Sequence, residues 1–211
     1  DDGTIVGFGS DGWSYKKVVT QEDFKETQVP GTGLQVDDTW TDDVKLPIGY
    51  AGSGKPMESL LNSGTNIGGG RCMGVVLQKD VTIDDASKIK GAQLSVSYDD
   101  GMVVYVNGTL AGAYHAELNS NVETGDMNKF PILGYRMSGS PVGNDPESQS
   151  GITLDKNLFK DGKNVITVAL VNDRDTSSDI FGDIELIATL DGVEGPETPS
   201  GTSIAKGDEW L

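Results

Sequence analysis

The sequence of 211 residues predicts an all-β protein, a jelly-roll sandwich of two antiparallel sheets. Residues 92–98 alternate apolar and polar side chains, the period-2 pattern of a strand with one buried face. Residues 102–106 are β-branched and aromatic, and Asn107-Gly108 follows, the dipeptide that best tolerates the two positive φ angles of a type I′ hairpin turn. No window of a dozen residues combines sustained 3.6-residue periodicity with helix caps.

The remaining elements are predicted in chain order from the same signals. Residues 74–83 form a strand, and residues 92–111 form a three-stranded meander with turns at 99–101 and 107–108. Residues 164–171 and 184–190 are the last two strands. Residues 115–151 show almost no periodicity, so they are either a functional loop or contain short strands that the pattern does not reveal.

Size and composition fit one sandwich followed by a tail. A hydrophobic content of 36% with 29 glycines is typical of a thin core with many turns. We therefore assign residues 1–190 to the sandwich and residues 191–211 to a linker, which is rich in Gly and Pro. Residues 203–211 resemble residues 4–13 in the order of their apolar, Gly, Asp and Trp positions. They either begin a second module or form a tail that packs on this domain.

The charge of the chain restricts its partners. A formal net charge of −17 repels phosphate backbones and anionic membrane surfaces, so we expect no nucleic acid partner. The longest apolar run, residues 168–171, is far too short for membrane insertion. Calcium and neutral polysaccharides remain compatible with this charge. Cys72 is the only cysteine, so no internal disulfide is possible.

Motifs for nucleotide binding and catalysis are incomplete. Residues 7–12 match G-x-G-x-x-G, but Trp13 and the residues after it predict a strand where a dinucleotide site needs a helix. Residues 49–55 approach a phosphate-binding loop, but Pro56 replaces the hydroxyl residue that would hold magnesium. His115 is the only histidine, which argues against a Ser-His-Asp triad or a multi-histidine metal site. We expect no enzymatic activity.

Several segments, in the right order, carry a family resemblance. They are Trp13-Ser14-Tyr15, Trp40 with residues 46–50, then residues 76–83, 98–108, 158–168 and 177–186. Together they resemble the galactose-binding-domain-like jelly roll appended to secreted bacterial metallophosphoesterases, spore-coat-type proteins and glycosidases. Two features depart from it: Gln78 stands where the family usually has Arg, and the segment 115–151 is longer than expected.

The resemblance implies a function for the chain. It implies a non-catalytic carbohydrate-binding or accessory module of a larger extracellular or cell-surface bacterial protein. Its partners would be a polysaccharide or glycan and the neighbouring domains of the same polypeptide. The alternative is a structural spacer or docking module with no glycan ligand, because functions are grafted onto folds.

Four aspartates are candidate ligands of a structural calcium ion. Asp99 and Asp100 point to opposite faces of a strand unless the turn rotates one of them, so they form no evident catalytic pair. They either solvate and cap a tight turn or provide oxygen ligands to a hard cation. With Gly101 they resemble the acidic pair of PA14-type lectins, which hold calcium there. Asp179 and Asp183 flank the start of the last strand, where related sugar-binding sandwiches place a structural calcium.

The aromatic residues divide into core and candidate ligand contacts. Five occupy the recurrent positions of the family and are predicted to be core: Trp13, Trp40, Tyr50, Tyr98 and Phe181. Sugar recognition needs exposed rings with polar groups beside them. The irregular segment supplies the candidates for ligand binding: Tyr114, His115, Phe130, Tyr135 and Arg136.

Overall fold

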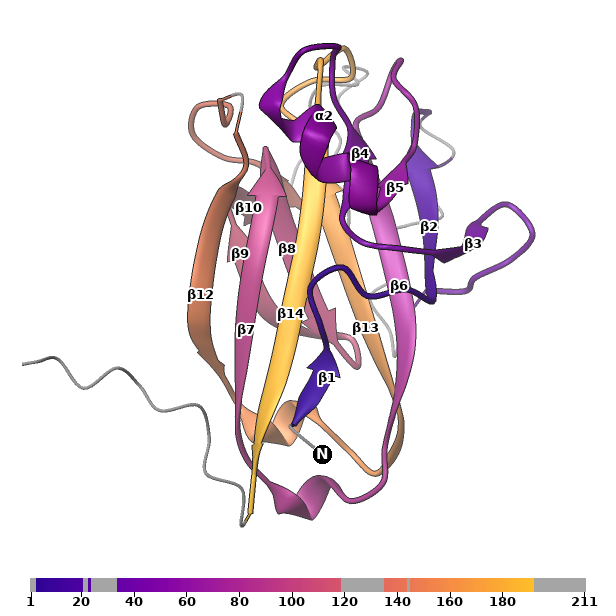
Figure 1. Cartoon of the computed structure of the whole chain (residues 1–211). Coiled ribbons are helices and arrows are strands. Elements are labelled where there is room, and N and C mark those ends of the chain that lie inside the picture. Colours follow the sequence, from indigo (N-terminus) through magenta and orange to yellow (C-terminus); the bar gives the residue numbers. More distant parts are fainter. Residues whose placement is uncertain (1–2, 21–22, 24–33, 119–134, 144, 192–211) are drawn as a thin grey trace, which may run out of the picture.

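The computed structural model describes residues 3–20, 23, 34–118, 135–143 and 145–191. Two six-stranded sheets pack face to face in this part of the chain (Figure 1). The predicted β-sandwich is therefore confirmed. One strand pair is parallel and all the others are antiparallel.

The first sheet has the order β12-β7-β14-β4-β5, with β1 beside β14. The two longest strands, β7 and β14, pair over almost their whole length, and β4 pairs in parallel with β5. The strands of this sheet are β1 (Thr4–Val6), β4 (Ile48–Tyr50), β5 (Thr65–Asn66), β7 (Ile89–Asp99), β12 (Glu147–Leu154) and β14 (Ile180–Leu190).

The second sheet has the order β3-β2-β6-β13-β8-β9. At its centre β13 pairs with β6 over all ten residues and with β8 on its other side. The strands of this sheet are β2 (Trp13–Val18), β3 (Thr41–Val44), β6 (Gly74–Ile83), β8 (Gly101–Val106), β9 (Thr109–Tyr114) and β13 (Gly162–Val171).

Short elements close the ends of the sandwich. The helix α2 (Pro56–Leu60) begins with a proline at its first turn and continues into the 3-10 turn η1 (Leu61–Ser63). Two further 3-10 turns are η2 (Ala86–Lys88) and η4 (Lys156–Leu158), and the strands β10 (Ala116–Leu118) and β11 (Tyr135–Met137) pair with each other. In the part of the chain that the structure describes, no helix has the length and apolar character needed to cross a membrane.

The core lies between the two sheets, where the alternating apolar side chains of each inner face meet. Trp13, Tyr98, Met102 and Leu170 are among its fully buried side chains. All five aromatic residues predicted to be core are buried, which confirms that prediction. Trp40 belongs to a second buried cluster with Val18 and Met73.

The predicted meander is wrong at its first turn. β7 and β8 lie in different sheets, and the segment Asp99-Asp100 carries the chain from one to the other. β7 pairs with β14 and β12, whereas β8 pairs with β13, so long-range ladders decide where each strand lies. The second turn is as predicted, because Asn107 and Gly108 have φ angles of 51° and 76° between the paired β8 and β9.

The boundaries of the other strands follow the sequence pattern closely. β6 has the predicted bounds, and the predicted strands 164–171 and 184–190 lie within β13 and β14. Within 115–151 the described residues contain β10, β11 and part of β12, so the expectation of hidden short strands holds there. The predicted tail begins at Asp191, and its residues 192–211 lie outside the described residues.

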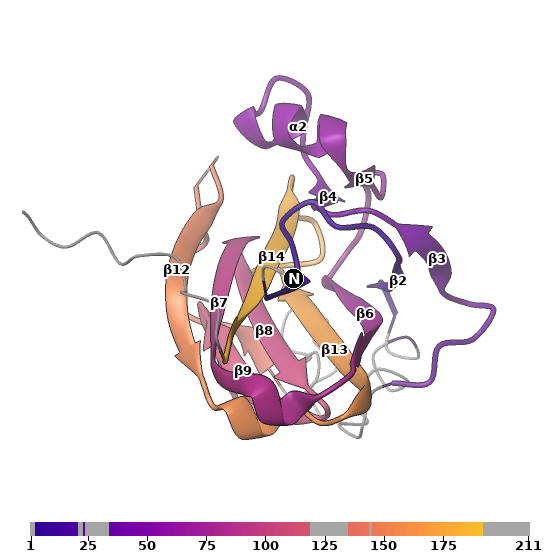
Figure 2. The same ribbon diagram turned by 60° about the horizontal axis from the view of Figure 1, so that its bottom comes forward.

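Both ends of the described chain lie at the same end of the sandwich (Figure 2). The Ala188 amide donates to the Gly3 carbonyl at 2.7 Å, which holds the start of the chain on β14. The Asp191 amide donates to the Lys88 carbonyl at 3.0 Å. The turn between β7 and β8 lies at the opposite end, because β7 runs from Lys88 towards it.

Candidate functional site

The candidate site surrounds the Asp99-Asp100 segment that crosses between the sheets. The two residues are joined by a cis peptide bond, and they are 1% and 2% exposed. Asp100 is fully engaged, since its Oδ1 accepts from the Val142 amide at 2.8 Å and its Oδ2 from the Asp173 amide at 2.9 Å. Asp99 is different: neither of its carboxyl oxygens has a hydrogen-bond partner.

Other buried acceptors without partners gather at the same end. Val171 pairs with Gly101, so the two residues that follow β13 lie beside the Asp99-Asp100 segment. Asn172 Oδ1 and Asp173 Oδ1 are buried there with no hydrogen-bond partner. Buried carbonyl and carboxyl oxygens normally accept a hydrogen bond. This group of buried, unpartnered oxygens therefore indicates a site that a ligand or ion from outside the described chain completes.

The electrostatics of Asp99 support this interpretation. Burial, followed by the negative charge of the adjacent Asp100, raises the pKa of the Asp99 carboxyl to about 9. Burial likewise raises the pKa of Asp173, with Asp100 again contributing. Asp99 consequently holds a proton at neutral pH unless a cation lies next to it.

The donor set fits an oxygen-ligated cation in its chemistry. Calcium takes carboxylate, amide and backbone oxygens, and Asp99 and Asn172 offer such oxygens free of other bonds. Within the described residues, no three His, Cys, Asp or Glu side chains come close enough together to hold a metal. A calcium ion here would therefore need the Asn172 amide and backbone carbonyls in addition to the carboxylates.

The loop that carries these acceptors is fixed by the neighbouring segment. Asn172 Nδ2 donates to the Cys72 carbonyl at 2.9 Å, and the Cys72 amide donates to the Asp175 carbonyl at 2.8 Å. The Tyr50 hydroxyl donates to the Ser177 carbonyl at 2.9 Å. The loop 172–179 thus has little freedom to move away from Asp99.

Of the four predicted metal ligands, Asp99 and Asp100 are adjacent, Asp179 is near enough for its charge to act on Asp99, and Asp183 lies elsewhere. Asp179 ends the loop just before β14, and its charge contributes to the raised pKa of Asp99, behind burial and Asp100. Asp183 lies further along β14, where its Oδ1 accepts from the Gly9 amide at 3.1 Å and the Ile184 amide at 3.0 Å. Asp183 therefore holds the connection between β1 and β2, apart from the Asp99 cluster.

The predicted ligand contacts are mostly packed against the protein. Tyr114 and Tyr135 are only 7% and 6% exposed, and the Tyr114 ring stacks on Tyr98 at 6.0 Å. Neither ring presents an open face for a sugar, contrary to the reasoning that selected them. Arg136 is exposed and pairs with Glu117 at 2.7 Å. Phe130 lies outside the described residues.

His115 connects these residues to the acidic cluster. It has a φ angle of 49°, its Nδ1 is buried without a hydrogen-bond partner, and its ring lies 6.4 Å from that of Tyr98. A Cβ added to Gly101 would lie 2.6 Å from the His115 carbonyl oxygen. Only glycine at position 101 allows this close approach, which brings His115 next to the Asp99-Asp100 segment.

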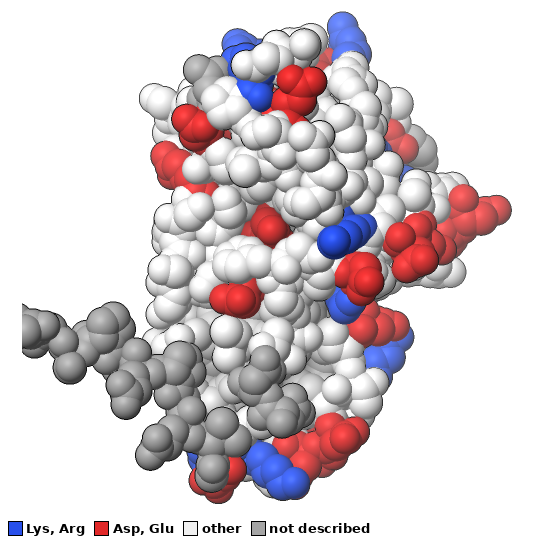
Figure 3. Space-filling view, in the orientation of Figure 1, with Lys and Arg blue, Asp and Glu red and all other residues white. Residues whose placement is uncertain are grey.

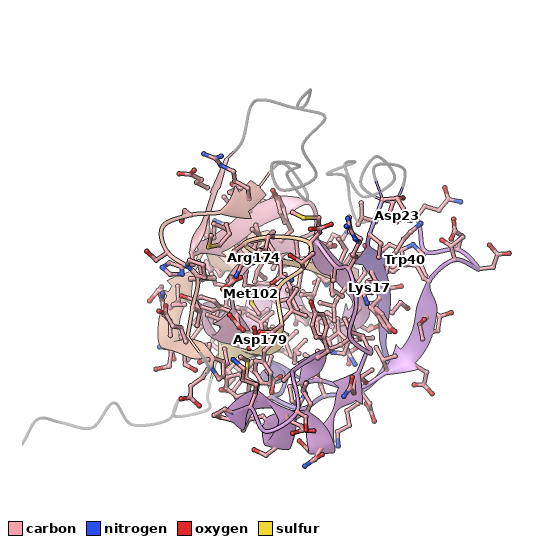
Figure 4. The ribbon with its side chains drawn as sticks, turned by 90° about the horizontal axis from the view of Figure 1, so that it is seen from above. Lys17, Asp23, Trp40, Met102, Arg174 and Asp179 are labelled. Carbon is pink, nitrogen blue, oxygen red and sulfur yellow. The ribbon has the colours of Figure 1, made fainter. Side chains whose placement is uncertain are left out.

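Sequence reasoning missed Asn172 and Asp173. The available signal was their position, because they are polar residues directly after the most regular apolar strand. Figure 4 looks down on this end of the sandwich and labels Arg174, Met102 and Asp179 close together near the middle of the view. Lys17 and Trp40 lie to one side in that view, towards β2 and β3.

The surface is acidic on the face shown in Figure 3. Red side chains gather on the projecting arm that carries β3, where four aspartates are exposed: Asp37, Asp38, Asp42 and Asp43. This distribution agrees with the strong negative net charge.

Comparisons with known proteins give similarity to solved structures only. No family model matches the chain, and no curated protein matches it. A calcium-binding mutant of Bacteroides uniformis beta-glucuronidase 2 is 16% identical with a TM-score of 0.47, covering 85% of this chain and 17% of that one. An uncultured Clostridium sp. beta-glucuronidase is 13% identical with a TM-score of 0.45, covering 87% of this chain and 29% of that one.

A third similar structure is a separate domain. The PA14 domain of the antifreeze protein MpAFP is 13% identical with a TM-score of 0.38, covering 91% of this chain and 88% of that one. These three similar structures are two beta-glucuronidases and one PA14 domain. This chain spans about a sixth of the length of the first glucuronidase.

Proposed function

We propose that this chain is a non-catalytic carbohydrate-binding or accessory module of a larger extracellular or cell-surface bacterial protein. In this proposal a structural calcium ion at Asp99 orders the loops at one end of the sandwich, and those loops contact a glycan. The observation that carries the proposal is the pair of buried, unpartnered Asp99 oxygens beside the unpartnered Asn172 Oδ1. Oxygen acceptors that lack donors are suited to a hard cation.

A calcium ion here would neutralise the negative charge of the buried aspartates and order the loops around them. Asp99 would lose its proton to become a ligand, and Asp179 would add negative charge nearby. The Asp100 bonds to the Val142 and Asp173 amides join two surface loops to the same point. A cation at this point would therefore stiffen both loops together, which lowers the entropy cost of binding a ligand.

The glycan contact is assigned to the polar side chains around this end. His115 directly precedes β10, and Arg136 lies within β11, where its side chain is exposed. Both ends of the described chain lie at the opposite end of the sandwich, so in this proposal the Asp99 end faces a polysaccharide while neighbouring domains follow behind. The net charge of −17 favours a neutral glycan over an acidic one.

The second candidate is a structural spacer with no glycan ligand. The burial of Tyr114 and Tyr135 favours it, because exposed aromatic faces are the usual sugar-stacking surfaces. In that case calcium would still rigidify the module without any ligand being bound.

A glycan array probed with and without calcium separates the two candidates. The carbohydrate-binding module is expected to bind a neutral glycan in calcium and to lose the signal in chelator. Arg136→Ala should weaken binding without changing the melting temperature, whereas Lys163→Ala, an exposed change on β13, is the matched control. Calcium stabilisation without glycan binding would support the spacer.

A further inference from the structure

A cleft opens at the end of the sandwich that carries the termini, far from Asp99. It has a volume of about 330 Å³ and lies between β1 and the last residues of β6. Its floor is apolar, formed by Ile89 and Ala188, which are buried, and by Val81 and Ile83, which are partly buried against the core. Asp84, Asp85 and Lys88 form its polar rim.

One wall of the cleft is an unpaired strand edge. β2 pairs with β6 only as far as Gln78, and no described strand continues along this edge beyond it. On β13, Val165 is paired with Asp80. The Val165 amide donates to Asn107 Oδ1 and the Val165 carbonyl accepts from the Asn107 amide, so both main-chain groups of Val165 point away from β6. Asp80 and Val165 are therefore a non-hydrogen-bonded pair, so the main-chain groups of Asp80 and, two residues on, of Thr82 point away from β13 along the free edge, and Thr82 lines the cleft.

An apolar floor beside a free strand edge suits an extended peptide. Such a peptide would bond to the main chain at Asp80 and Thr82 and place alternate side chains over Val81 and Ile83. The unpaired edge of four residues is about 13 Å long. We propose that the cleft is a docking site for residues 202–211 of this chain, added as a strand on the free edge of β6.

Three observations favour this segment as the occupant. Leu190 lines the cleft, and the Asp191 carboxylate pairs with Lys90 at 2.8 Å, so the chain leaves the described part at the cleft mouth. Residues 192–201 can span up to about 33 Å when extended, which is more than the strand edge requires. β6 runs towards this mouth, so a chain that turns back into the cleft runs antiparallel to it, as β2 does.

The composition of the segment also fits. The segment has an isoleucine followed by a tryptophan, Ile204 and Trp210, as the start of the chain has Ile5 and Trp13. Ile5 belongs to the neighbouring strand β1, and Trp13 belongs to the core. A segment with this pattern can supply a short strand and a large apolar side chain. Docking would cover the apolar floor and pair the exposed edge, which removes a template for aggregation.

Hydrogen exchange in the full chain tests the proposal. The Asp80 and Thr82 amides are expected to exchange at least tenfold faster in Ile204→Asp than in the unchanged chain, because the apolar anchor is lost. Thr198→Asp, in the linker, is the matched control and should leave both rates unchanged. Equal rates in the unchanged chain and in Ile204→Asp would overturn the proposal.

A cross-link gives an independent measurement. In Thr82→Cys with Ala205→Cys, a short bis-maleimide is expected to join the two cysteines within one chain, while Cys72 stays unreactive because it is buried. Thr153→Cys with Ala205→Cys is the control, since Thr153 is exposed on β12 at the other edge of the sandwich. Links between chains only, or equal yields for both pairs, would contradict docking. Either result would favour a second copy or a separate following module.

Discussion

Asp99→Asn should make the calcium-free protein more stable at neutral pH. The carboxyl of Asp99 is 1% exposed, and neither oxygen has a partner. Burial and the charge of Asp100 raise its pKa to about 9, from 3.8 in the unfolded chain. Between these values the folded protein holds a proton that the unfolded chain has released, so the stability of the wild type falls as the pH rises.

The magnitude follows from the size of the pKa shift. Each pH unit in this window costs about 1.4 kcal/mol, so the cost between pH 3.8 and pH 7 is about 4 kcal/mol. Asparagine removes the titration but leaves a buried amide whose donors need partners, at a cost of about 1–3 kcal/mol. The net gain at pH 7 is therefore about 1–3 kcal/mol. For a chain of this size it corresponds to a rise of about 2–12 °C in melting temperature.

Thermal unfolding in chelator at pH 4, 7 and 9 measures this effect. The advantage of Asp99→Asn over the wild type should grow steadily with pH. Asp42→Asn, on the exposed face of β3, is the matched control and should show no such trend. Added calcium should stabilise the wild type and leave Asp99→Asn unchanged. A variant that is less stable than the wild type at pH 9 in chelator would refute the assignment of Asp99 as an unpartnered buried acid.

Four further outcomes are expected. Calcium binding, followed by titration calorimetry, should tighten by about tenfold per pH unit from pH 6 to pH 8, because Asp99 must release its proton. Burial raises the pKa of Asp183 to about 6, so the wild type should lose stability as the pH rises from 4 to 6, and Asp183→Asn should flatten that slope in pH-dependent denaturation. Trp40→Ala should cost about 3–5 kcal/mol in urea unfolding, and Tyr114→Ala should also destabilise the fold, because both side chains are buried. Arg136→Ala should change stability by less than about 1 kcal/mol, since its pair with Glu117 is exposed, while lowering glycan affinity in an affinity gel.

The strands themselves were predictable from local pattern. The bounds of β6 and the Asn107-Gly108 hairpin follow from β-branched residues, alternation and the special backbone angles of Asn-Gly. The sandwich class follows from the same signals together with the lack of helical periodicity. These features depend on neighbours a few residues apart, so the sequence carries them directly.

Only the tertiary structure decided which strands share a sheet. The pattern is the same whether the Asp99-Asp100 turn joins two paired strands or carries the chain between sheets. The choice was made by the ladders of β7 with β14 and of β8 with β13, whose partners are about 60 to 100 residues apart in the chain. α2 and β12 were missed for related reasons: the helix has five residues, too few to show a period, and the strand has five exposed residues at its start.

The candidate site was likewise predictable from the sequence only in part. The sequence identified Asp99, Asp100 and Asp179 as acidic residues next to turns, because short polar side chains gather there. It could not show that Asp99 is buried without a partner or that Asn172 and Asp173 lie beside it, since both facts depend on the end of β13 meeting the start of β8. It also placed Tyr114 and Tyr135 on an open loop, whereas packing against other strands buries both rings. Local pattern determined the strands and turns of this protein, and long-range pairing determined which polar groups meet and which aromatic rings are covered.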